Sequence, residues 1–403
     1  MKKRLALFGS LILAAIFSPI VALLLSAIGL FLSVWIVVPA PNFSLLPFGV
    51  ATPELSPWLL GLNAIAAIVA FKSLKLGWLG YGALASSVVA LTLSSLPLIQ
   101  LPKAVQNAEA AMVQALGQDY AAKLPDNSRP QPFVLLDAFR GLPTPEVRYT
   151  PDIPFARPDG VELKLDVYRP PQPGRYPAIV MIYGGAWREG NPRLNADFNR
   201  YMAARGYVVW AISYRLAPRY RFPAQLEDVR SAITFVRQHA AEYETDPDRL
   251  ALMGRSAGGH LAMLGAYKPD ATPVRAVVNY YGPVDLTVGY YDLPKPDPID
   301  SRTVLRTFLG GSPEEFPDLY RAASPINDVT RPLPPTLLIY AGRDHLVQAK
   351  FGEQMGDRLR SYGTIAPYIE IPWAEHAFDA VFNGVSNQLA LYYTERFLAW
   401  ALR

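Results

Sequence analysis

Leu250-Ala-Leu-Met-Gly254-Arg-Ser256-Ala-Gly258-Gly259 is a short apolar run followed by a glycine-flanked serine, and a helical pattern covers residues 257–267. A serine hydroxyl attacks a carbonyl when it stands clear of the sheet on a tight turn, where flanking glycines remove the side chains that would clash. The helix that starts after Ser256 directs free backbone N–H groups to the same point. The stretch predicts a nucleophilic serine between a buried strand and a helix; the alternative is a glycine-rich turn with an idle serine.

Around this turn, short apolar runs alternate with longer stretches of helical period, which is typical of an α/β sheet protein. Continuous apolar runs are expected of strands that are covered on both faces. The expected strands are residues 161–168, 178–183, 207–212, 250–253, 276–279, 336–340 and 368–371. The expected helices are residues 194–205, 224–240, 257–267, 348–362 and 386–402. Residues 149–403 are therefore predicted to form one α/β domain.

A nucleophilic serine requires a base and a group that orients the base. Two of the four histidines, His239 and His260, lie in helical patterns where capping or packing explains them, and a third directly follows Asp344. His376 lies in a loop past the last expected strand. Asp344 follows a buried strand and should emerge at the carboxyl edge of the sheet, where open α/β sheets place their sites. The order Ser256, Asp344, His376 is that of a serine hydrolase triad on such a sheet.

A second glycine turn, Tyr183-Gly184-Gly185-Ala186-Trp187, follows an expected strand and offers backbone N–H groups that no side chain covers. With the N–H group of Ala257, the N–H groups of Gly184 and Gly185 would stabilise the negative oxygen of a tetrahedral intermediate. Without the serine, aspartate and histidine, the same residues would be an ordinary glycine turn.

Residues from about 149 to 403 resemble the α/β-hydrolase esterases of the hormone-sensitive-lipase and feruloyl-esterase-like (BD-FAE, kynurenine-formamidase-like) groups. The matching pieces are the loop 184–187, Ser213-Tyr-Arg-Leu-Ala-Pro218, Phe222-Pro-Ala224, Asp228, the motif 254–259, Gly342-Arg-Asp344 and Glu375-His376-Ala-Phe378. The resemblance implies a structural role for Asp228. It also implies that Ser256 is the nucleophile, that His376 is the base and that Asp344 orients the base. The implied oxyanion donors are Gly184, Gly185 and Ala257. One position departs from the pattern, because Tyr183 stands where these families usually have histidine.

The resemblance implies hydrolysis of a small-molecule carboxylic ester through an acyl-enzyme, with no metal or organic cofactor. Residues 282–325 lie where this fold inserts a cap over the pocket, and they should set specificity. Aromatic residues in and beside this insertion favour apolar or aromatic acyl groups, although such residues are equally common in the core of a cap. The alternatives are an amidase or peptidase on the same triad, and a non-catalytic ligand-binding member of the fold.

The composition separates the first quarter of the chain from the rest. Hydrophobic residues make up 51% of the chain and charged residues 18%, against about 25% charged in ordinary proteins. Residues 1–101 carry five basic side chains and one acidic side chain, and the remaining 302 residues carry 33 of each sign. The net charge of +4 thus reflects the N-terminal region, which argues against a nucleic-acid partner. The absence of cysteine excludes disulfides, zinc–thiolate sites and thiol nucleophiles.

Three apolar runs in residues 1–101 predict an all-α transmembrane segment of about three helices. Residues 5–38 contain no ionisable side chain, and about 20 such residues cross a bilayer. This run is too long for the apolar core of a secretory signal. Residues 58–71, extended by some residues upstream, and residues 76–101 form the second and third runs. Pro19 could instead divide the first run into two short spans and make four in total.

The basic residues beside the spans predict the orientation, because lysine and arginine in short loops are held on the cytoplasmic side. Residues 1–4, Lys72 and Lys75 would face the cytoplasm, and the loop 39–57, without a basic residue, would face outward. Three spans then place the catalytic domain outside the cytoplasm, and four would reverse this. The spans show no ionisable or clustered polar residues, so we expect an anchor rather than a transporter.

Residues 102–148 are predicted to connect the membrane region to the catalytic domain. Apolar residues at helical spacing over residues 103–124 predict an amphipathic helix. This helix would either lie on the membrane surface or pack on the next domain. The proline-rich stretch after it is predicted to be a linker.

Overall fold

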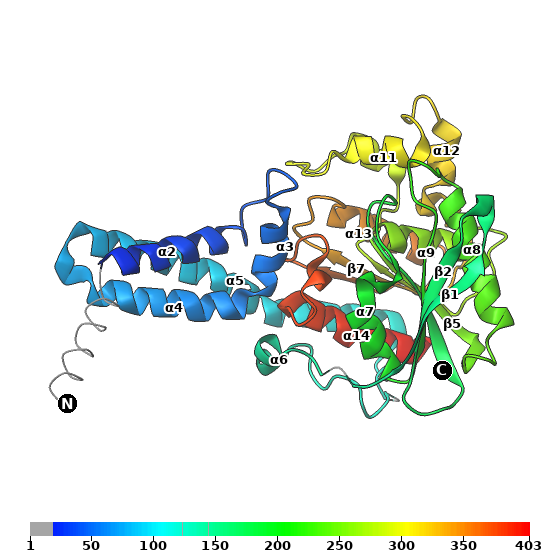
Figure 1. The fold of residues 1–403 in the computed structure, drawn as a ribbon, viewed down its shortest axis with the longest axis horizontal. Coiled ribbons are helices and arrows are strands. Elements are labelled where there is room, and N and C mark those ends of the chain that lie inside the picture. The colour runs from blue at the N-terminus through cyan, green and yellow to red at the C-terminus, as the bar shows by residue number, and fades with distance from the viewer. Residues whose placement is uncertain (1–18, 123, 144) are drawn as a thin grey trace.

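The computed structural model describes residues 19–122, 124–143 and 145–403 (Figure 1). The predicted basic flank at residues 1–4 and the first part of the predicted first span lie outside the described residues. Figure 1 shows an elongated helical bundle joined end-on to a larger α/β region.

The α/β region is built on one eight-stranded sheet. Its strands are β1 Arg148–Ala156, β2 Leu163–Arg169, β3 Tyr176–Ile182, β4 Val208–Ile212, β5 Thr245–Arg255, β6 Ala276–Tyr280, β7 Thr336–Ala341 and β8 Tyr368–Ile371. Their order across the sheet is β1-β2-β4-β3-β5-β6-β7-β8. β2 pairs antiparallel with β1 and β4, and every other pair is parallel. The predicted α/β-hydrolase fold with a mostly parallel sheet is confirmed.

Helices cover both faces of this sheet, and three of its strands are buried along their whole length. The helices of the region are α6 Leu135–Arg140, α7 Ala196–Ala203, α8 Ala224–Gln238, α9 Ala257–Tyr267, α10 Leu286–Tyr291, α11 Ser301–Leu309, α12 Pro317–Ala322, α13 Ala349–Ser361 and α14 Val385–Ala401. Short 3₁₀ turns are η1 Leu74–Leu76, η2 Pro158–Gly160, η3 Pro192–Asn195, η4 Pro325–Asp328 and η5 Phe378–Ala380. Every residue of β4, β6 and β7 is buried. Burial on both faces explains why these strands read as continuous apolar runs.

The bundle consists of α2 Pro19–Val34, α4 Ser56–Lys72 and α5 Trp78–Leu116, with α3 Leu46–Glu54 lying across its end. Among the described residues, α5 is long and apolar enough to cross a membrane. α3 and α4 meet the same criterion together, but they are bent by 84° at their junction. α2 is apolar and shorter within its described part. The three-span arrangement and the membrane itself stay predictions.

The structure corrects the expected break between the third span and the amphipathic helix. Residues 76–101 and 103–124 were predicted to be separate, but α5 continues without interruption through the boundary and ends at Leu116. Gly117 follows with a φ of +90°, a conformation that glycine adopts without strain and that ends the helix. Ala108 and Met112 are buried in the core of the α/β region. Of the two alternatives, this part of the helix packs on the α/β region.

The bundle also holds a buried polar cluster, contrary to the expectation that its helices lack one. The Nδ2 group of Asn63 donates to the hydroxyls of Ser33, at 2.9 Å, and Ser94, at 3.2 Å. A Cβ at Gly29 would lie 2.1 Å from the Asn63 amide oxygen, so glycine permits this approach. Hydrogen bonds of this kind join helices in an apolar environment. The residues are scattered in the sequence and meet only when the three helices pack.

Candidate active site

Ser256 stands on a strained turn between β5 and α9. Its φ of 51° and ψ of −123° lie outside the usual regions for a residue with a side chain, as in nucleophile turns of α/β sheets. A Cβ at Gly258 would lie 2.0 Å from the carbonyl oxygen of Ile182, and one at Gly254 would lie 2.1 Å from that of Gly258. Both glycines are therefore required for the turn to fit against the sheet.

The structure brings Ser256, His376 and Asp344 into one hydrogen-bonded chain. His376 Nε2 lies 2.9 Å from Ser256 Oγ, and His376 Nδ1 lies 2.8 Å from Asp344 Oδ2. Because a carboxylate only accepts, Nδ1 carries the proton and Nε2 is free to accept from the hydroxyl. The second carboxylate oxygen accepts the N–H groups of Leu346 and Val347 at 2.8 and 2.7 Å. These contacts fix the carboxylate at the end of β7.

Burial and charge act in opposite directions on this pair. Burial lowers the pKa of His376, but the charge and the hydrogen bond of Asp344 raise it, and the resulting pKa lies above the ordinary histidine value. Burial raises the pKa of Asp344, and the neighbouring imidazole opposes that rise. An imidazole with a raised pKa is a stronger proton acceptor, which suits a general base.

The three predicted oxyanion donors lie beside the serine. Gly184, Gly185 and Ala257 line the same cavity as Ser256 and His376. Gly185 has a φ of +124°, and a Cβ there would lie 2.2 Å from the carbonyl oxygen of Glu189, so the turn depends on glycine. Acyl transfer requires backbone N–H donors and a nucleophilic hydroxyl in one cavity, and this cavity is lined by both the glycine turn and Ser256.

Tyr183, the departure from the family pattern, supports this glycine turn by packing. Its ring stacks on Tyr214 with the centroids 4.5 Å apart, and the Tyr214 hydroxyl donates to the Tyr183 carbonyl at 3.1 Å. A Cβ at Gly190 would meet the Tyr183 ring at 2.4 Å. The phenol ring is thus sandwiched between Tyr214 and the returning backbone, and it fixes the start of the loop.

His260, which sequence reasoning assigned to packing, also ties the glycine turn to the segment after β6. Trp187 Nε1 donates to His260 Nδ1 at 3.2 Å, and His260 Nε2 lies 2.7 Å from the carbonyl oxygen of Ala323. The Trp187 ring stacks on Phe308 of α11 with the centroids 4.2 Å apart. Burial lowers the pKa of His260 to about 4, so the imidazole is neutral and holds both contacts. No sequence signal indicated these contacts, because they join three distant segments.

Glu375 is a second residue that the sequence did not single out. One carboxylate oxygen accepts the N–H groups of His345 and His376, at 2.7 and 3.0 Å. The other lies 2.6 Å from the His345 Nδ1, and this contact raises the pKa of His345. Glu375 is buried. It therefore joins the loop that carries Asp344 to the loop that carries the histidine base.

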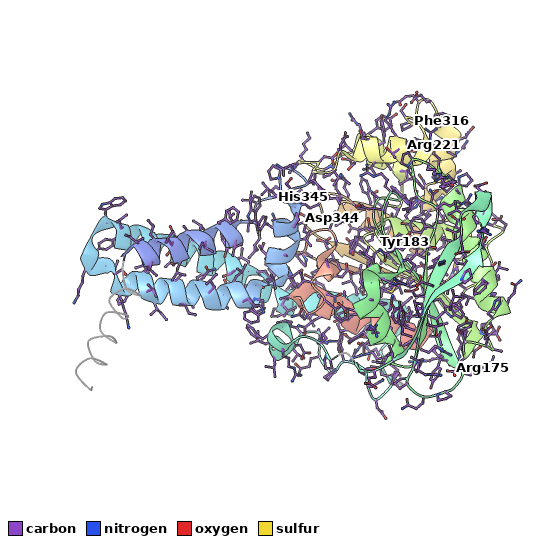
Figure 2. The ribbon with its side chains drawn as sticks, viewed as in Figure 1. Arg175, Tyr183, Arg221, Phe316, Asp344 and His345 are labelled. Atoms are coloured by element: carbon purple, nitrogen blue, oxygen red, sulfur yellow. The ribbon has the colours of Figure 1, made fainter. Side chains whose placement is uncertain are left out.

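The serine opens into a mainly apolar cavity of about 630 Å³. Its walls come from the two glycine turns, from α10 and α11, and from the loop between α2 and α3. Figure 2 shows Asp344 and His345 on the side of the α/β region that faces the bundle. Within the described parts of the chain, no group of three or more histidine and acidic side chains is placed to hold a metal ion.

The chain is similar to known proteins over most of its α/β region. Residues 165–359 match the family model described as BD-FAE, and this range contains Ser256 and Asp344. This part of the α/β region is therefore similar to the BD-FAE family. His376 lies after the matched range, in the loop that follows β8, and its Nε2 lies beside Ser256 Oγ.

Two curated relatives of this chain are esterases of Mycobacterium tuberculosis. Esterase LipQ is 33% identical over 63% of this chain, and Esterase LipC is 34% identical over 53% of it. The chain spans 66% and 57% of the lengths of these two proteins. A solved structure of a Thermogutta terrifontis esterase with bound butyrate is 27% identical, with a TM-score of 0.50, over 64% of this chain and 92% of that one.

Proposed function

We propose that this protein is a serine hydrolase that cleaves carboxylic esters and that its N-terminal helices anchor it in a membrane. The observation that carries the catalytic part is the hydrogen-bonded chain from Ser256 through His376 to Asp344. The esterase activity named for its relatives supports an ester as the substrate. The long apolar helix α5 supports the anchor.

The reaction starts with neutral His376. As Ser256 Oγ attacks the ester carbonyl, its proton moves to His376 Nε2, and the Asp344 carboxylate stabilises the imidazolium that forms. The imidazolium then gives this proton to the departing alcohol, leaving an acyl-enzyme. Water, activated by the same imidazole, attacks the acyl group and releases the carboxylic acid.

The glycine turns act on the negative charge that develops during both attacks. The N–H groups of Gly184, Gly185 and Ala257 are assigned to the carbonyl oxygen as it becomes an oxyanion. Fixed donors of this kind typically contribute about 3 kcal/mol each to the stability of the transition state. No step requires a metal or an organic cofactor.

The cavity favours small-molecule esters with an apolar or aromatic acyl group. Its walls are mainly apolar, and Val304 and Leu305 of α11 and Phe351 of α13 contribute to them. Residues 282–325, which we assign as the cap, supply much of this surface. The butyrate bound to the related esterase makes a short acyl ester a suitable first substrate.

We propose the following organisation for the whole chain. Residues 1–101 form the membrane helices, residues 102–148 the connection, and residues 149–403 the catalytic domain. α4 ends at Lys72, and η1 contains Lys75. Figure 1 shows that this end of α4 points away from the α/β region. The preference of lysine for the cytoplasmic side then places the N-terminus in the cytoplasm and the catalytic domain outside it. The test is a reporter fused to the C-terminus that is active only in the cytoplasm. A signal from this reporter would contradict the orientation.

The test of the activity is hydrolysis of p-nitrophenyl butyrate by the full chain and by Ser256→Ala. We expect the variant to lose at least about 10³-fold in kcat/KM while it remains folded. Ser231→Ala, which removes a hydroxyl on the exposed side of α8, is the matched control and should keep full activity. Retained activity in Ser256→Ala would refute the proposal.

A panel of peptides and amides separates an esterase from an amidase, and ligand binding without turnover would identify a non-catalytic member of the fold.

A further inference from the structure

The loop between α2 and α3 forms part of the wall of the catalytic cavity. Phe43 of this loop lines the same cavity as Ser256, although its side chain is 65% exposed. Leu346, two residues after Asp344, and Ile299, before α11, line the cavity beside it. The N-terminal region therefore does more than hold the enzyme in place, because it completes the site.

This loop is fixed against the catalytic region at several points. Leu46 and Val50 of α3 form an apolar cluster with Ile299 and Leu346. The Arg343 guanidinium donates to the carbonyl of Val37, just after α2. These contacts reach the segments that carry Asp344 and the cap. The position of the α2–α3 loop is thus coupled to the catalytic side chains.

At the same end of the bundle, α6 of the connecting segment exposes apolar side chains. α6 presents Leu135, Leu136 and Phe139 to the outside, with exposed fractions of 53, 57 and 42%. Trp58, in the first turn of α4, donates from Nε1 to the Ala138 carbonyl at 3.0 Å, and its ring contacts Phe139. Figure 1 shows α6 and α3 together at the junction of bundle and α/β region. Tryptophan beside exposed apolar groups is typical of a membrane–water interface.

On the other side of this junction, exposed apolar residues lead from the bundle to the cavity. Phe31 of α2, Val38 after it and Phe43 are exposed by 48, 43 and 65%. Apolar side chains at such positions are stable in contact with lipid. A cavity of about 630 Å³ also has the size of sites for drug-sized ligands, which is more than a short acyl group needs.

We propose that the substrate is a membrane-dissolved ester with a lipid-length apolar chain, which enters the cavity from the bilayer surface and lies against Phe43. This inference rests on the proposed esterase function and adds the substrate class. The ester carbonyl would reach Ser256, and the distal part of the chain would remain between Phe43 and the lipid. Each methylene that leaves water raises the partition of the ester into the bilayer about fourfold, so long-chain esters are the ones concentrated at the mouth of this path.

The experiment uses the full chain reconstituted in phosphatidylcholine vesicles. The readout is the ratio of kcat/KM for p-nitrophenyl dodecanoate to that for p-nitrophenyl butyrate. Phe43→Asp should lower this ratio about tenfold, because a carboxylate beside the chain removes apolar contact. Phe43→Leu should retain most of the wild-type ratio, because leucine keeps the apolar contact. Phe316→Asp is the matched control, because Phe316 is an exposed aromatic residue on the cap away from the junction (Figure 2). The ratio of kcat/KM values in this variant should equal that of the wild type.

The outcomes separate this inference from the proposed function. If the wild type hydrolyses neither ester, the esterase proposal fails. If it hydrolyses butyrate but Phe43→Asp leaves the ratio unchanged, or changes it no more than Phe316→Asp does, the membrane-substrate inference is refuted and the esterase proposal stands. Fluorophosphonate labelling of each variant verifies that the site is intact.

Discussion

Acidification should destabilise this protein through His260, whose two hydrogen bonds join the glycine turn to the segment after β6. Burial lowers the pKa of this imidazole from 6.5 to about 4. Because the folded pKa lies below the unfolded one, the neutral imidazole contributes its full stability above pH 6.5. That contribution is lost as the pH falls from 6.5 towards 4. The two pKa values correspond to a loss of about 2 kcal/mol at pH 5 and about 3 kcal/mol at pH 4.

The perturbation that isolates this effect is His260→Gln. Glutamine does not titrate, and its amide can still donate to the Ala323 carbonyl. For a domain of this size, 2 kcal/mol corresponds to about 4–8 °C in Tm. We therefore expect the drop in Tm between pH 7.5 and pH 5 to be smaller in the variant than in the wild type by about this amount.

Thermal unfolding of the full chain in detergent micelles, followed by tryptophan fluorescence, measures the difference. Other groups also titrate between pH 7.5 and pH 5. The informative quantity is therefore the difference between the decrease in Tm of the wild type and that of the variant. His239→Gln, which changes a histidine at the end of α8 outside this network, is the control and should behave like the wild type. An equal drop in His260→Gln and the wild type would refute the reasoning.

Three further predictions concern the base, the serine turn and the bundle. The pKa of His376 is raised, and the base acts only when it is neutral, so kcat/KM for p-nitrophenyl butyrate should fall with decreasing pH along a limb centred above pH 6.5. In Asp344→Asn, kcat for the same ester should drop about 10⁴-fold. Gly258→Ala should lower the free energy of unfolding by about 3 kcal/mol or more, because the alanine Cβ would lie 2.0 Å from the carbonyl oxygen of Ile182. A decrease in Tm measures this loss of stability. Asn63→Leu should weaken the bundle by about 1 kcal/mol, seen as a lower Tm in micelles.

The buried strands were predictable because their sequence pattern follows directly from their burial. β4, β6 and β7 are covered on both faces, so each reads as an apolar run. β1 was missed because it contains Pro151 and Pro154, and proline is compatible with a strand mainly at a sheet edge. β1 is such an edge strand, and it pairs with β2 alone.

The path of α5 could not be read from local signals. The apolar run 76–101 was predicted to end just before Pro102, a residue type that usually interrupts a helix. In the structure α5 passes through this position. The buried residues on either side of this point supply tertiary contacts, and such contacts outweigh the local preference.

The three side chains of the hydrogen-bonded chain were predictable, and the residues that support them were not. Ser256 and Asp344 follow buried stretches of β5 and β7, and His376 lies in the loop after β8, so local patterns identify them. His260 and Glu375 act through partners on segments far away in the chain, and Phe43 reaches the cavity only because the N-terminal region docks on it. Contacts of this kind follow from the tertiary structure alone.

The most direct measurement of the central claim is the site of covalent labelling by a fluorophosphonate. This reagent reacts with a serine that a neighbouring base activates. Peptide mapping by mass spectrometry should locate the label on Ser256 in the wild type, and His376→Ala should abolish it. A label on another serine, or undiminished labelling in His376→Ala, would contradict the account.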